Sequence, residues 1–159
     1  MRDFKLRKLI LTAIFASLSF VLSTFVVFPY MAPFQHLINV VAALFLGPYY
    51  NLLQALLTGI FRMILNARSI LAITGAIIGA FLSGLVYEKT KSPLKTAFAE
   101  VFGTGILSAL ISFPIMKLFF GLNIKASKFY YFIPFFLPSA AVGGFLGFLI
   151  LLRLKKIKF

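Results

Sequence analysis

Long apolar runs, separated by short polar or proline-containing breaks, make up almost all of this 159-residue sequence. A helix needs about 20 apolar residues to cross a bilayer, and most of the runs approach or reach that length. The pattern predicts an all-α integral membrane protein, a compact bundle of six transmembrane helices forming one domain over residues 1–159. The predicted spans are 6–28, 34–47, 49–66, 70–88, 95–118 and 130–153.

The second and third predicted spans are short and are separated only by Gly47 and Pro48. They are predicted to form a tight helical hairpin, tilted or only partly crossing the membrane. Small residues recur every four positions in the last three spans, which favours close approach of helix backbones in lipid. These small residues are Gly75, Gly79 and Ser83, then Gly105 and Ala109, then Ser139, Gly143 and Gly147.

Composition supports a membrane protein. Hydrophobic residues make up 62% of the chain and charged residues 12%, far from the balance of a soluble domain. The first apolar run exceeds the roughly 7 to 15 residues of a signal-peptide core, so we expect it to be a retained span. The chain has no cysteine, which excludes disulfides and thiolate metal sites.

The net charge of +13 follows from lysines and arginines at the ends of the apolar runs. This placement indicates anchoring in anionic lipid rather than binding to nucleic acid. Six spans put eleven basic residues on the side of both termini and five on the other. The positive-inside rule therefore predicts a multi-pass protein of the cell membrane with both termini in the cytoplasm.

The stretch 28–39, which joins the first apolar run to the second, carries the main candidate site. Gln35, His36 and Asn39 share one helical face, because positions three and four apart are neighbours on a helix. His36 is the only histidine, and polar groups at the mouth of an apolar segment favour a small-molecule site. The alternative is a packed histidine that a neighbouring group satisfies.

Other polar residues have two interpretations each. Arg62, with Asn66 one turn later, orients a solute or reaches lipid headgroups. Tyr130 and Tyr131 stack on a ligand or belong to an interfacial aromatic belt. Glu100 is the one acid inside an apolar span and belongs to a structural polar cluster or has a ligand or coupling role. The predicted topology places it nearer Asn51 and Gln54 than the outward loops.

Catalysis has little support in the sequence. Three carboxylates and one histidine offer neither a converging acid pair nor a metal site, so no cofactor or metal is expected. The sequence has no Walker A, G-x-S-x-G or H-E-x-x-H pattern. An intramembrane enzyme would have to depend on Glu100.

Three stretches resemble the ThiW family: APFQHLINVVAALFLGPYY (32–50), FRMILNARSILAITGAIIGAFLSGLVY (61–87) and AEVFGTGILSALISFPI (99–115). Members are substrate-binding S-components of energy-coupling factor (ECF) transporters, thought to import hydroxyethylthiazole, a thiamin precursor. The resemblance implies partnership with a membrane coupling protein and two cytoplasmic ATPases. It implies docking through an A-x-x-x-A face on the first helix, here Ala13 and Ser17, where serine replaces the second alanine.

The resemblance also implies capture from outside under a lid formed by the first outward loop. We assign Phe28, Pro29, Tyr30 and Pro33 to this lid. Residues and resemblance together predict a small, largely neutral solute. Gln35, His36 and Asn39 would hydrogen-bond it, Arg62 and Asn66 would lie across the mouth, and Tyr130 and Tyr131 would stack on it. The alternatives are an S-component for a different vitamin, and a stand-alone small-solute channel or secondary carrier.

Overall fold

The computed structural model describes residues 2–25, 32–120 and 128–156, and in these ranges it is helical with short turns. Six helical rods correspond to the six predicted spans, and four of them are long and apolar enough to cross a membrane. The elements are α1 (Arg2–Phe25), α2 (Pro33–Leu46), α3 (Pro48–Leu65), α4 (Leu71–Thr90), α5 (Pro93–Phe102), η1 (Gly103–Ser108), α6 (Ala109–Phe120) and α7 (Ile133–Lys156).

The fifth rod is continuous but not uniform. α5 passes into the π-helical segment η1 and then into α6 without an intervening loop. Periodicity did not predict this wider segment. Its glycines permit close neighbours: a Cβ on Gly103 would lie 2.8 Å from Gly79 Cα of α4, and one on Gly105 would lie 3.0 Å from Leu137 Cα of α7.

The hairpin of α2 and α3 is confirmed, and one residue connects the two helices. Gly47 has φ of 73°, a left-handed conformation that glycine adopts without steric cost. Pro48 follows as the first residue of α3, where its missing N–H leaves no helical bond unmade. Lys8 of α1 donates to Leu46 O at 3.0 Å and thereby satisfies a carbonyl at the end of α2.

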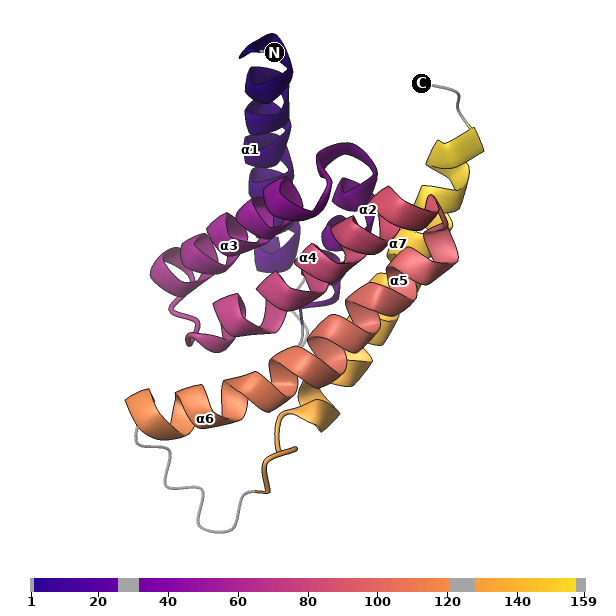
Figure 1. Cartoon of the computed structure of the whole chain (residues 1–159). Helices are drawn as coiled ribbons and strands as arrows, with labels where there is room; N and C mark the ends of the chain where they lie inside the picture. The colour runs from indigo at the N-terminus through magenta and orange to yellow at the C-terminus, as the bar shows by residue number, and fades with distance from the viewer. Residues whose placement is uncertain (1, 26–31, 121–127, 157–159) are drawn as a thin grey trace.

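α2 is the central element of the bundle. Eleven of its fourteen residues are buried, and it packs against α1, α4 and α7. Figure 1 shows the α3–α4 pair beside it, with α5 running along α7 and both chain termini at one end. The two ends of the bundle are called here the terminal end, which holds the termini, and the opposite end.

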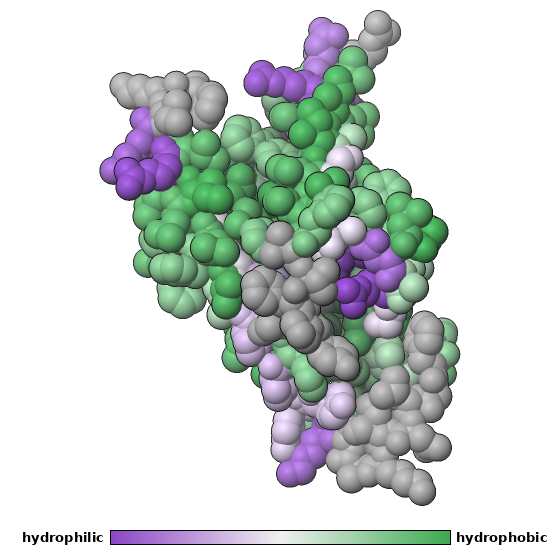
Figure 2. Space-filling model, turned by 180° about the vertical axis from the view of Figure 1, so that it is seen from behind, coloured by the Kyte–Doolittle hydropathy of each residue, from purple (hydrophilic) through white to green (hydrophobic). Residues whose placement is uncertain are grey.

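The surface of the bundle is largely apolar, whereas its interior contains many polar side chains. Large apolar side chains are exposed along α1, α6 and α7, as a lipid-facing surface requires. Figure 2 shows this apolar surface interrupted by separate hydrophilic patches, two of them near the termini. The interior, by contrast, holds many polar side chains together with small alanines and glycines. The bundle therefore encloses polar groups that lipid would exclude.

Gly84 of α4 tests how tightly the hairpin turn is packed. A Cβ there would lie 2.7 Å from Pro48 Cα and 2.9 Å from the Gly47 carbonyl, and backbone atoms cannot move aside. We expect Gly84→Ala to destabilise the fold by about 1–3 kcal/mol, as overpacking does. Thermal unfolding in mild detergent measures the effect.

Gly75→Ala is the matched control on the same helix, because its nearest atoms belong to the Phe136 ring at 3.1 Å, a side chain rather than backbone. Unfolding of Gly84→Ala at the wild-type temperature would contradict close packing of α4 on the turn.

Candidate functional site

A pocket of about 610 Å³ lies at the opposite end, between the start of α2, the turn from α3 to α4, α6 and the start of α7. Aromatic and apolar side chains make most of its wall: Leu71, Ala72, Met116, Tyr131, Phe132, Phe135 and Phe136. Its polar lining residues are Gln35, His36, Arg62, Arg68, Ser69 and Ser139. Apolar walls with a few placed polar groups are typical of small-molecule sites.

The start of α2 is held in place by α7. The Ala32 backbone N–H donates to Ser139 Oγ at 2.9 Å. Gly143 of α7 lies against Pro33, and a Cβ there would collide with the Pro33 carbonyl and lie 2.7 Å from His36 Cβ. Close contact with α7 therefore fixes the first turn of α2, which carries Gln35 and His36.

His36 is paired with a buried carboxylate. Its Nδ1 lies 3.0 Å from Glu100 Oε1, and both side chains are almost completely buried. The same oxygen accepts from Asn39 Nδ2 at 2.9 Å and from Thr104 Oγ1 at 3.1 Å. Because a carboxylate only accepts, the contact assigns the proton to Nδ1 and leaves Nε2 for a ligand.

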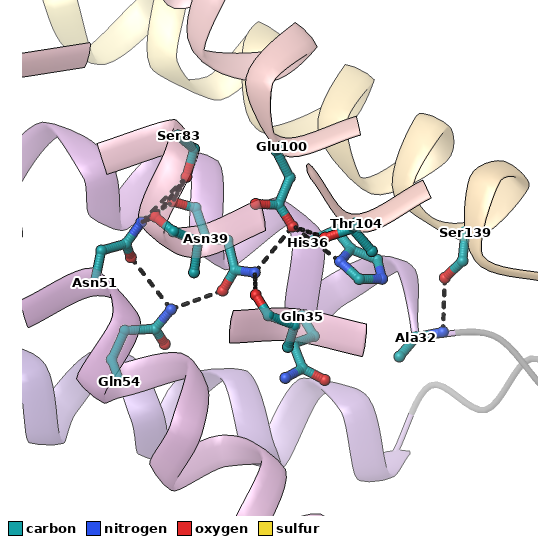
Figure 3. A network of polar contacts seen from close by, with 12 residues as sticks. Ala32, Gln35, His36, Asn39, Asn51, Gln54, Ser83, Glu100, Thr104 and Ser139 are labelled. Carbon is teal, nitrogen blue, oxygen red and sulfur yellow. Dashed lines mark hydrogen bonds and ion pairs between the residues drawn. The ribbon is translucent and has the colours of Figure 1, made fainter. Parts of the chain in front are cut away.

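Figure 3 shows that the contacts of Glu100 continue into the bundle. Gln54 donates to Asn39 Oδ1 at 2.7 Å and to Asn51 Oδ1 at 3.2 Å. Asn51 then donates to Ala80 O at 2.7 Å. We call His36, Glu100, Asn39, Gln54 and Asn51 the polar chain.

The polar chain changes the interpretation of Glu100. The sequence placed this acid nearer Asn51 and Gln54 than the outward loops. In the structure it bonds directly to His36 and Asn39 and reaches Gln54 only through Asn39. Helical periodicity relates residues of one helix and carries no information about the alignment of α2 with α5, so this pairing was not visible in sequence.

Arg62 is inside the bundle rather than at its surface. It is 9% exposed, and its Nη1 donates to Gln35 Oε1. Its position is therefore not that of an arginine that reaches out to headgroups. Arg62 Nε and Gln35 Nε2 are buried without a hydrogen-bond partner among the described residues. Both are unused donors in side chains that line the pocket.

The other predicted site residues divide into two groups. Tyr131 lines the pocket, with its ring 5.7 Å from that of Phe135. Asn39, Asn66 and Tyr130 are not among the lining residues: Asn39 lies behind His36 in the polar chain, Asn66 bonds Thr24 Oγ1 on α1, and Tyr130 is beside Lys128.

The predicted lid and docking residues have separate outcomes. Phe28, Pro29 and Tyr30 are outside the described residues, whereas Pro33 is buried at the start of α2. Ala13 and Ser17 are exposed on α1, while Thr12 and Ala16 face inward. Two polar pocket residues, Arg68 and Ser139, were not proposed from sequence, since Arg68 counted only toward orientation and Ser139 only toward helix packing.

A bundle of apolar helices with an enclosed polar chain and a pocket of this size defines an α-helical integral membrane protein that accommodates a small molecule. The chain belongs to the thiamine-precursor transporter protein (ThiW) family, whose sequence model matches residues 9–157. No curated protein and no solved structure matches it. The resemblance found in the sequence is thereby confirmed, and the chain is a membrane transporter protein of that family rather than an enzyme.

Glu100 provides a test of the polar chain. In Glu100→Leu, three donors lose their shared acceptor, and each buried unpaired group costs about 1–3 kcal/mol. Glu100→Gln keeps one carbonyl oxygen as an acceptor and should lose less stability than Glu100→Leu. We expect thermal stability to fall in the order wild type, Glu100→Gln, Glu100→Leu.

Glu88→Gln is the control, because Glu88 is exposed at the terminal end of α4. Wild-type stability of Glu100→Leu would show that the three donors do not depend on the carboxylate.

Proposed function

We propose that this chain is the substrate-binding subunit, or S-component, of an ECF-type importer. It would capture hydroxyethylthiazole or a related thiamin precursor and deliver it with a separate coupling protein and two cytoplasmic ATPases. The observation that carries the proposal is the pocket at the opposite end, with ring-sized aromatic walls and hydrogen-bonding groups from Gln35, His36 and Arg62. Membership of a thiamine-precursor transporter family supports the choice of solute.

The proposed orientation places the terminal end in the cytoplasm and the pocket toward the outside of the cell membrane. The basic residues support it, because eleven of the sixteen lie at the terminal end in the predicted topology. A site that opens outward suits capture before transport. An external supply of energy is supported by the lack of any nucleotide-binding motif in the sequence.

Within the pocket, each group has a proposed role. A thiazole ring would lie against Tyr131 and the neighbouring phenylalanines, which stack on flat aromatic ligands. His36 Nε2 and the amide of Gln35 would bond its heteroatoms. Asn39 would act indirectly, because its side chain bonds Glu100 and thereby orients the acceptor of His36.

Binding is the first test. Purified protein should bind hydroxyethylthiazole saturably at one site per chain, measured by calorimetry in mild detergent. His36→Ala should weaken affinity by about tenfold, the loss expected when one ligand hydrogen bond is removed.

Asn66→Ala is the matched control, because this side chain is bonded to α1 and is not part of the pocket lining. A wild-type protein that is folded and ignores every thiamin precursor would remove the proposed substrate.

Energy supply is the second test. In liposomes this chain alone should give no net flux, and uptake should require the coupling module and ATP. Ser17→Phe on the exposed face of α1 should abolish that uptake while leaving substrate affinity unchanged, because the bulky ring would block docking.

Leu118→Phe on the exposed surface of α6 controls for added bulk. Flux through the chain alone would favour the channel or carrier alternative instead.

A further inference from the structure

We propose that the precursor bound in this pocket is an anion, whose phosphate or carboxylate group lies between Arg62 and Arg68. The inference rests on the proposed function for the site and concerns the charge of its substrate. It goes beyond the largely neutral solute that the sequence suggested. Four observations about the charges and the wall of the pocket support this inference.

The first observation is that two guanidinium groups are brought to one pocket. Arg62 lies in the last turn of α3, and the chain then folds back so that the Arg68 N–H donates to the Arg62 carbonyl at 3.3 Å. Both side chains line the pocket. An anion between them would be attracted by both guanidinium groups.

The second observation is that Arg62 is buried with only a neutral partner. Its Nη1 donates to the Gln35 amide oxygen, and its Nε has no partner among the described residues. Burial of a cation is costly unless an opposite charge compensates it. The unused Nε–H is a donor in a pocket-lining side chain, and arginine donors suit phosphate and carboxylate oxygens.

The third observation is that the protein supplies no carboxylate to this pair. The chain has three acids: Asp3 and Glu88 lie at the terminal end, and Glu100 is not among the lining residues. Glu100 already accepts from three donors, and His36 lies beside it. In the described part of the chain, the His36–Glu100 contact is the one ion pair found.

The fourth observation is that the rest of the wall suits a ring with a charged arm. Tyr131, Phe132 and Phe136 provide an aromatic side, while the arginines come from the α3–α4 end of the same pocket. A phosphorylated or carboxylated heterocycle would match both parts. The same two cations would repel the positively charged thiazolium of thiamin itself, so the pocket would select the precursor against the finished vitamin.

The test compares hydroxyethylthiazole with its monophosphate ester, binding each to the purified full chain in neutral detergent without lipid. We expect the ester to bind about tenfold more tightly, with a preference that falls as salt rises from about 0.05 to 0.5 M. Arg68→Gln should reduce the affinity for the ester about tenfold and leave that for the alcohol nearly unchanged. Arg62→Gln should weaken binding of the ester more than binding of the alcohol, because Arg62 also holds the Gln35 amide that both compounds would contact.

Arg153→Gln, at the exposed terminal end of α7, is the matched control. Arg68 is exposed, so its variant keeps the test informative if Arg62→Gln fails to fold. Equal or tighter binding of the alcohol would overturn the inference and leave the proposed function intact. If the folded wild-type protein binds neither the alcohol nor the ester, the inference and the proposed function are both overturned.

A phospholipid headgroup carries the same phosphate chemistry as the ester. A further titration therefore distinguishes lipid binding from solute binding. Short-chain phosphatidylglycerol is titrated in place of the ester, with free inorganic phosphate in parallel. Tighter binding of the ester than of either probe supports a solute anion. Arginine-dependent binding of the lipid that exceeds binding of the ester would overturn it.

Discussion

A carboxylate enclosed by helices needs hydrogen-bond donors from the protein, and the supply of donors to one oxygen of Glu100 constrains much of this bundle. Three donors converge on Oε1, two from α2 and one from η1. Room for the group exists because α4 presents Gly79 there: a Cβ at that position would lie 2.7 Å from Oε2. The small-residue face of α4 therefore does more than bring helices together, since it also leaves space for a buried charge.

His36 connects this interior arrangement to the pocket. One ring nitrogen belongs to the polar chain and the other is available to a ligand, so the orientation of the ring is set before any ligand arrives. Gln35 is held similarly by Arg62. A binding group fixed by its neighbours loses less conformational entropy on binding, which favours affinity for a small solute with few atoms to contribute.

The sequence predicted the six rods, the Gly47–Pro48 hairpin and the placement of Gln35 and His36 on one helix face, because each depends on properties of a single segment. It did not predict that Glu100 bonds His36, since that depends on the alignment of two helices far apart in the chain. Asn66 was expected across the mouth and Tyr130 against the ligand, yet Asn66 bonds Thr24 on α1 and Tyr130 lies beside Lys128. Interhelical register and side-chain direction are the information that hydrophobic patterning lacks.

The shortness of α2 has a further consequence. Fourteen residues rise about 21 Å, whereas the hydrocarbon layer is about 30 Å thick. The far end of α2 is level with Lys8 and Glu88, because Gly47 lies beside both side chains at the terminal end. The helix is therefore shorter than that layer is thick, and its first residues line the pocket at the opposite end. A charge held among the apolar side chains of that pocket is felt more strongly than in bulk water.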